Sequence, residues 1–250
     1  HVLSRKTQIT GLPRPHKLVH SHLYLSQCVI ETHRAFKQSD IPHLFLKGPV
    51  LAETLFGERL LRYSSDLDLL IRPESIQKAD RCLRQLGLVP DTPRDDLQRR
   101  ARFSQWIRRD VCYRRPGLPY GFELHWKTHE VDAFHLPSRL AFESQISHQF
   151  FHGESIPVFE DSLNAIYLCF HAAKHHWSRL RWLMDIAVFL RIKNLQWDHL
   201  LEKARTLHLE APVIEAALLL RDLFNIPLAL PANTLLTPYA RRFYRRYWLE

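Results

Sequence analysis

Two aspartates separated by one residue are the clearest candidate for chemistry in the sequence. Asp66 and Asp68 stand at the start of an apolar run that ends at Ile71. If this run forms a strand, both carboxylates project from the same face, because side chains alternate across a strand. Neighbouring carboxylates repel each other unless a proton or a cation lies between them. We therefore expect Asp66 and Asp68 to bind a divalent metal, Mg²⁺ first and Mn²⁺ as the alternative.

A third carboxylate fits the same site. Apolar and polar residues alternate over 120–126, so that Glu123 and His125 share one face of a predicted strand. If this strand lies beside the one that carries the two aspartates, Glu123 completes a cluster of three carboxylates. Such a cluster can hold metal ions and help to deprotonate an attacking hydroxyl.

A glycine turn upstream is suited to bind phosphate. Lys47-Gly48-Pro49 joins a predicted short strand to a predicted helix. Glycine lets the backbone approach a ligand closely, and the N-terminus of a helix attracts anions. Lys47 and Arg62 add positive charge. Pro49 has no N–H to offer a phosphate.

Residues 163–190 predict one long helix with a polar face. Successive residues of a helix are about 100° apart, which puts these side chains on one face: His171, His175, Ser178, Trp182 and Asp185. Lys174 and Arg181 lie at one edge of that face. Three interpretations stay open. The face is solvated or structural, or it is the far wall of a nucleotide cleft, or His171 and His175 form a zinc site at their four-residue spacing. In the second interpretation Lys174 and Arg181 bind phosphates, and His175 or Trp182 stacks on a base.

Helices and short strands alternate around these residues. The predicted elements are a helix over 17–36, a strand over 43–47, a helix over 49–56, a strand over 67–71, a helix over 74–86 and a hairpin from 106–114 and 120–126. From about residue 132 onwards the pattern is helical, with breaks at prolines. The predicted fold class is α+β: a helical segment (1–40), a core with a small mixed β-sheet (41–130) and a helical C-terminal domain (131–250).

The composition is that of a globular protein. Of 250 residues, 46% are hydrophobic and 24% are charged, which excludes a disordered chain or a collagen-like fibre. No uninterrupted apolar stretch reaches the ~20 residues of a membrane helix, so we expect no membrane span. The N-terminal residues lack a signal-peptide core. Four widely spaced cysteines without a C-x-x-C pair are typical of reduced thiols, and we expect a cytoplasmic protein.

The charge is strongly positive. Lysine and arginine number 35 against 26 aspartate and glutamate, a formal net charge of +9. This excess favours an anionic partner such as a nucleotide, a nucleic acid or an acidic membrane surface. The run 241–248 interleaves arginine with aromatics, which fits either such a partner or, more simply, a basic amphipathic helix packed on the domain. Residues 99–102 are expected to be a solvated basic face.

Taken together, the segments 46–48, Arg62 with 65–70, and 123–126 resemble the uncharacterised nucleotidyltransferase family of the DNA polymerase β-like superfamily. The resemblance continues to about residue 190 through segments 171, 175–177, 179–182 and 185–186. It implies the α+β core and helical domain described above. It also implies Mg²⁺-dependent transfer of a nucleoside monophosphate from a nucleoside triphosphate, expected to be ATP, to an acceptor.

The resemblance also implies roles for individual residues, and it favours the nucleotide-cleft interpretation of the polar face. Catalysis and metal binding fall to Asp66, Asp68 and Glu123. Nucleotide binding falls to the following: Lys47, Gly48, Arg62, Ser65, Lys174, His175, Arg181 and Trp182. The chain departs from the superfamily in having proline after the glycine, where serine or glycine is usual.

Two other functions compete with an enzyme. One is a catalytically silent binding or regulatory module with the same fold, comparable to an antitoxin. The other is a basic nucleic-acid-binding protein, whose affinity should fall steeply with salt. For an enzyme, the acceptor stays open among a small molecule, a peptide or protein side chain, and an RNA end.

Overall fold

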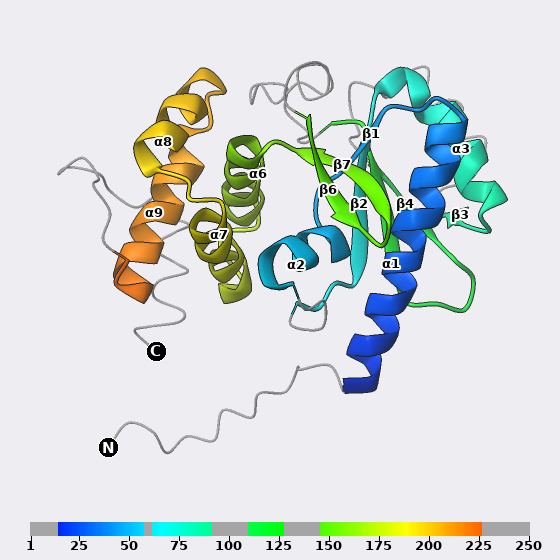
Figure 1. Ribbon diagram of the computed structural model, residues 1–250, viewed down its shortest axis with the longest axis horizontal. Coiled ribbons are helices and arrows are strands. Elements are labelled where there is room, and N and C mark those ends of the chain that lie inside the picture. Colours follow the sequence, from blue (N-terminus) through cyan, green and yellow to red (C-terminus); the bar gives the residue numbers. More distant parts are fainter. Residues whose placement is uncertain (1–14, 58–61, 92–109, 128–145, 227–250) are drawn as a thin grey trace.

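The computed structural model describes residues 15–57, 62–91, 110–127 and 146–226 (Figure 1). The first half of the chain forms α1 (Pro15–Gln38), β1 (His43–Phe45), α2 (Pro49–Phe56), β2 (Asp66–Ile71), the single-turn helix η2 (Pro73–Ser75), α3 (Ile76–Gln85), β3 (Val89–Pro90), β4 (Asp110–Arg114) and β5 (Gly121–His125). The second half forms β6 (Ile146–Phe151), β7 (Glu154–Phe159), α6 (Asp161–Lys174), α7 (Leu180–Ile192), α8 (Trp197–Thr206) and α9 (Glu210–Phe224). The α+β class predicted from the sequence is confirmed.

A five-stranded mixed sheet carries the two aspartates. Its strand order is β1-β2-β5-β4-β3, with β2 and β5 parallel and the other pairs antiparallel. Side chains alternate along β2 as expected. Leu67, Leu69 and Ile71 are fully buried in one apolar core, whereas Leu70 belongs to the core on the opposite face. Asp68 therefore projects from the same face of the sheet as Leu70.

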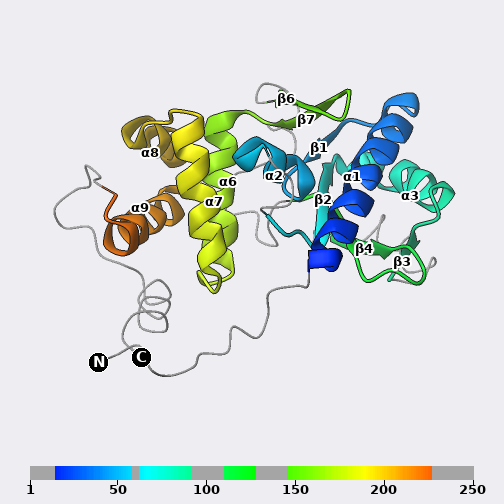
Figure 2. The same cartoon turned by 60° about the horizontal axis from the view of Figure 1, so that its bottom comes forward.

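Two apolar cores hold the molecule together. One lies between the sheet, α1, α3 and the β6–β7 hairpin. The other unites α6–α9 with Leu44 and Leu70 of the sheet and with Leu51 and Leu55 of α2. Helices α6–α9 are here called the helical group. Helix α2 packs against both α1 and α7, so it lies between the sheet and the helical group (Figure 2). The helical group is thus fixed to the sheet by shared packing, which sets the cleft between them.

The prediction that the chain is helical from about residue 132 is wrong for 146–159. This segment is the antiparallel hairpin β6–β7, which packs on β1 beside the sheet (Figure 1). Its two-residue turn is His152-Gly153, with φ of 49° and 83°. A tight hairpin turn of this kind needs positive φ at both positions, and glycine supplies one of them at little cost. The buried side chains of Phe151 and Ile156 then join the core.

The single helix predicted over 163–190 is two helices. Helix α6 ends at Lys174, and α7 begins at Leu180. His176 and Trp177 between them have positive φ, which an α-helix does not allow. The turn buries the Trp177 indole completely, and its Nε1 donates to Glu215 Oε2 of α9 at 2.8 Å. This tertiary contact overrides the helical periodicity of the sequence.

Several predictions concern the wider chain. None of the described helices is both long and apolar enough to cross a lipid bilayer. All four cysteines are free thiols. The boundary predicted at residue 40 falls between α1 and β1. The boundary at 131 and the basic runs 99–102 and 241–248 lie outside the described residues and stay predictions.

A buried histidine pair makes stability depend on pH. His43 Nδ1 donates to the Ile41 carbonyl at 2.8 Å, and His43 Nε2 lies 3.0 Å from His33 Nδ1. Burial lowers the pKa of His43 to about 4. The unfolded chain therefore binds a proton that the folded chain does not, and stability falls as the pH drops from 6.5 towards 4.

We expect the wild type to lose about 2–3 kcal/mol of unfolding free energy between pH 7 and 4.5 through His43. Urea unfolding at both pH values measures this loss, and His43→Gln should remove that part of it. An equal loss in the variant would contradict the assignment.

Candidate active site

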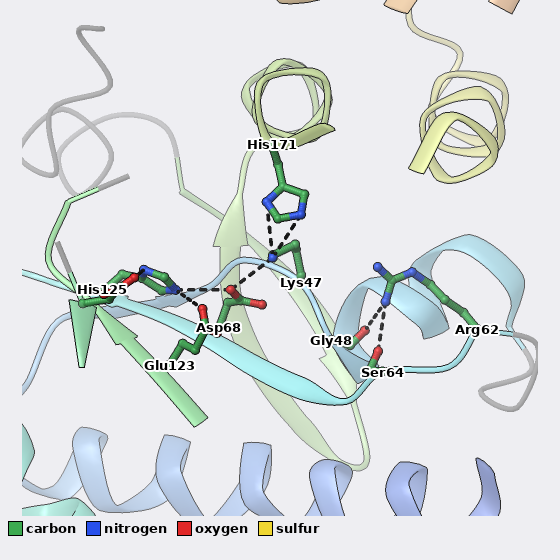
Figure 3. Close-up of polar contacts among 9 residues, drawn as sticks. Lys47, Gly48, Arg62, Ser64, Asp68, Glu123, His125 and His171 are labelled. Carbon is green, nitrogen blue, oxygen red and sulfur yellow. Dashed lines mark hydrogen bonds and ion pairs between the residues drawn. The ribbon is translucent and has the colours of Figure 1, made fainter. Parts of the chain in front are cut away.

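The predicted carboxylates come together on two neighbouring strands. The parallel register of β2 and β5 places Asp68 opposite Glu123 and Asp66 opposite Gly121. Ligand atoms of Asp68, Glu123 and His125 all lie within 4.8 Å of one another (Figure 3). Asp66 is not part of this compact group, although it lines the same cleft as Glu123. Of the three carboxylates predicted to converge, Asp68 and Glu123 thus come together with His125, while Asp66 lies outside the compact group.

The charges of this group are only partly balanced. Burial and then the Asp68 charge raise the pKa of Asp66. Burial acts on Asp68 too, but Lys47 and His125 outweigh it and hold the pKa of Asp68 well below its usual range. Even so, Asp68 Oδ2 is buried and has no hydrogen-bond partner among the described residues. A buried carboxylate oxygen without a partner fits a metal ligand, because a cation would satisfy it.

His125 belongs to the site, although sequence reasoning assigned it no role. Its Nε2 lies 3.2 Å from Asp68 Oδ1 and 3.3 Å from Glu123 Oε2, and its Nδ1 lies 3.6 Å from Asp110 Oδ2. Burial favours the neutral imidazole, but the hydrogen bonds that His125 donates to Asp68 and Glu123 raise the pKa of His125 to about 9. The available signal was its position two residues after Glu123, on the same strand face.

Lys47 connects the sheet to the helical group. Its ammonium lies 3.1 Å from Asp68 Oδ1 and 3.4 Å from His171 Nδ1 of α6 (Figure 3). Burial, and then the Lys47 charge, hold the pKa of His171 well below its usual value. His171 is therefore neutral and can accept from Lys47. The zinc interpretation gains no support, since no third ligand joins His171 and His175 in the described part of the chain.

Gly48 forms the turn that the sequence predicts. It has φ of 77° and directly precedes α2. A Cβ at this position would lie 3.3 Å from the Asp66 carbonyl oxygen and 3.3 Å from Leu67 Cδ1. Glycine is required here for both the backbone conformation and the close approach to β2.

We expect Gly48→Ala to lower stability by about 1–2 kcal/mol and to weaken triphosphate binding. Gly57→Ala is the matched control, because Gly57 also has positive φ but nothing within 4 Å of its Cβ position. Urea unfolding and calorimetry measure the two effects. Equal losses in both variants would show that the approach to β2 is unimportant.

Arg62 is buried and held by protein partners. Its Nε donates to Asp185 Oδ2 of α7 at 3.0 Å, and its Nη1 donates to the Gly48 carbonyl and to Ser64 Oγ (Figure 3). Arg181 of α7 donates to the Tyr63 carbonyl at 2.7 Å. Both arginines thus hold the segment before β2 against α7. We interpret Arg62 as a positioning residue for the glycine turn. Arg62 also lines the cleft beside Gly48, so the phosphate contact expected from the sequence stays a prediction.

The cleft has two lobes, and both are lined by four shared residues: Lys47, Glu123, His171 and His175. The larger, of about 740 Å³, contains Gly48 and is here called the glycine lobe. The smaller, of about 370 Å³, contains Lys174 and is called the lysine lobe. Other predicted nucleotide-binding residues line the glycine lobe: Ser65, His175, Arg181 and Trp182. The structure therefore separates Lys174 from Arg181, which the sequence placed together on phosphates.

An aromatic wall closes one side of the glycine lobe. The Trp182 ring centroid lies 5.1 Å from that of His171 and 5.3 Å from that of His175. The Arg179 guanidinium lies 5.4 Å from the Trp182 ring centroid. The end of α6 and the start of α7 thus bring together side chains that can stack on a base and attract phosphate.

The chain belongs to the uncharacterised nucleotidyltransferase family, whose model matches residues 18–225. Its fold is similar to that of the antibiotic-resistance factor ANT(2'')-Ia in solution, with a TM-score of 0.53 and 11% identity over 82% of this chain and 98% of that one. The crystal structure of ANT(2'')-Ia in complex with adenylyl-2''-tobramycin gives a TM-score of 0.50 and 10% identity, over 71% of this chain and 92% of that one. A weaker likeness, with a TM-score of 0.42, is to lincomycin-bound lincosamide antibiotic adenylyltransferase LnuA, 12% identical over 68% and 96%. Curated protein sequences give no match.

Proposed function

We propose that the protein is a Mg²⁺-dependent nucleotidyltransferase. It transfers a nucleoside monophosphate from a nucleoside triphosphate, expected to be ATP, to a hydroxyl or phosphate of an acceptor. The observation that carries this proposal is the buried Oδ2 of Asp68, which lacks a partner among the described residues and lies beside Glu123 in a cleft that also contains Asp66 and the glycine turn. Family membership and the fold support it.

The residues of the cleft have different roles in the transfer. Asp66, Asp68 and Glu123 would hold the metal, which when bound neutralises charge on the α-phosphate and the leaving pyrophosphate. Gly48 and the N-terminus of α2 receive the triphosphate oxygens. Lys47 supplies a positive charge at the junction of the lobes.

Glu123 is placed to act on the acceptor. Its side chain is 37% exposed, whereas that of Asp68 is 2% exposed, so Glu123 is better able than Asp68 to meet an incoming hydroxyl directly. In the transfer, the acceptor oxygen forms a bond to the α-phosphorus as the bond from that phosphorus to the pyrophosphate oxygen breaks. The hydroxyl proton passes to the Glu123 carboxylate. Trp182, on the aromatic wall, stacks on the base.

The resemblance in fold leaves the acceptor to experiment. ANT(2'')-Ia holds an adenylylated tobramycin, but at 10% identity its acceptor does not carry over to this chain. The silent-module alternative is less well supported, because a module without catalysis has no need for a buried carboxylate oxygen that lacks a partner among the described residues. Nucleic-acid binding is a separate possibility, which salt-dependent binding of a labelled RNA would reveal.

Transfer itself is tested with α-labelled ATP, Mg²⁺ and a mixture of cellular small molecules. We expect pyrophosphate release and a new species heavier by one adenylyl group, both lost in Asp66→Asn. Asp198→Asn is the matched control, since Asp198 is an exposed carboxylate in the first turn of α8, away from the cleft. Equal product in wild type and Asp66→Asn would contradict the proposal.

A further inference from the structure

A lysine that has no carboxylate partner among the described residues lines the lysine lobe. Lys174 is the last residue of α6, it is half-buried, and it faces the same lobe as Tyr167 and Phe170. Throughout the part of the chain that the structure describes, no ion pair or hydrogen bond to its side chain is found. Lys47, in contrast, already pairs with Asp68. Lys174 thus offers a positive charge to whatever enters this lobe.

The position of Lys174 relative to the carboxylates indicates which substrate it meets. The residues suited to triphosphate line the glycine lobe with Asp66, whereas Lys174 lines the lobe that contains Asp68 and His125. Glu123 lines both lobes. A nucleotide seated at Gly48 therefore fills the glycine lobe and leaves the lysine lobe, with Lys174, for the acceptor. This assignment rests on the proposed function.

We propose that the acceptor carries an anionic group, a phosphate or a carboxylate, which Lys174 binds while the acceptor hydroxyl lies at Glu123. A half-buried ammonium forms a charge-assisted hydrogen bond to such a group. The nearly buried rings of Tyr167 and Phe170 form an apolar wall beside it. An acceptor rich in amino groups is disfavoured, because Lys174 repels it.

The proposal is tested by titrating nucleotide-loaded protein with a matched series of small hydroxyl compounds. The protein is first loaded with adenosine 5'-(α,β-methylene)triphosphate and Mg²⁺, which fill the glycine lobe without transfer. Glycerol 3-phosphate, glycerate, glycerol and tobramycin are then added separately and followed by NMR. The first two probes separate phosphate from carboxylate recognition, and glycerol and tobramycin supply the neutral and cationic comparisons.

We expect at least one anionic probe to bind more tightly than glycerol, and Lys174→Gln to weaken that binding about tenfold with the nucleotide affinity unchanged. Lys174→Arg should retain the binding. Lys37→Gln is the matched control, since Lys37 also lies in the last turn of a helix but is exposed and lines neither lobe.

Three results would overturn the proposal: anionic probes that bind no better than glycerol, tighter binding of tobramycin, or a loss of nucleotide affinity in Lys174→Gln. Failure of the proposed function is seen separately and earlier, as the absence of Mg²⁺-dependent nucleotide loading in the wild type. In that case the assignment of Lys174 to an acceptor falls with it.

Discussion

Asp68→Asn is expected to reduce nucleotidyl transfer by about 10³-fold or more. The substitution removes the charge of the most buried of the three candidate carboxylates, and the lost metal-mediated stabilisation of the transition state is worth several kcal/mol. Asp68 is also the residue whose Oδ2 has no protein partner among the described residues. The measurement is the initial rate of pyrophosphate release from ATP with Mg²⁺ and the acceptor mixture.

Stability must be separated from catalysis in this variant. Asp68 neutralises Lys47 and His125, so Asp68→Asn also destabilises the fold. Glu123→Gln is the second variant, because its more exposed side chain can lose its charge with less effect on folding. Thermal unfolding checks both proteins. A folded Asp68→Asn protein with wild-type rates would exclude the metal role of Asp68.

Asp185→Asn is expected to destabilise the protein by about 3 kcal/mol or more. The substitution leaves the Arg62 guanidinium buried without its counter-charge, and breaking a buried pair costs about 3–5 kcal/mol. Both side chains are nearly inaccessible, at 6% and 3% exposure. Burial raises the pKa of Asp185 even beside Arg62, so the pair does not fully offset its own desolvation. Urea unfolding at pH 7 measures the change.

The double variant Arg62→Met/Asp185→Leu separates charge burial from packing. It removes both charges and keeps apolar volume, so it should recover most of the lost stability. We expect triphosphate binding to stay impaired, because Arg62 Nη1 no longer holds the Gly48 carbonyl in place. If the double variant is no more stable than Asp185→Asn, the loss comes from packing and not from an uncompensated charge.

The carboxylate site could be predicted from the sequence because it depends on patterns within short segments. Alternation along a strand puts Asp66 and Asp68 on one face, and the same alternation exposes Glu123 beside them. The glycine turn was equally local, since Gly48 followed by a proline at the first helical position marks the start of α2. These features needed only the assumption that the two strands are neighbours, which the register of β2 and β5 confirms.

The helical wall of the cleft depended on contacts that the sequence does not display. Burial of Trp177 against α9 breaks the predicted long helix, and this break places Lys174 in one lobe and Trp182 in the other. Likewise, the sequence gives no sign that Arg62 is paired, because its partner Asp185 lies 123 positions away. Residues fixed by distant partners cannot be assigned from spacing alone.

The central claim is tested most directly by calorimetric titration with adenosine 5'-(α,β-methylene)triphosphate, with and without Mg²⁺. The account predicts that wild type and Asp198→Asn bind the analogue only when Mg²⁺ is present, and that Asp68→Asn loses at least about tenfold in affinity. Equal affinity without Mg²⁺, or unchanged affinity in Asp68→Asn, would contradict a metal-dependent nucleotide site at these carboxylates.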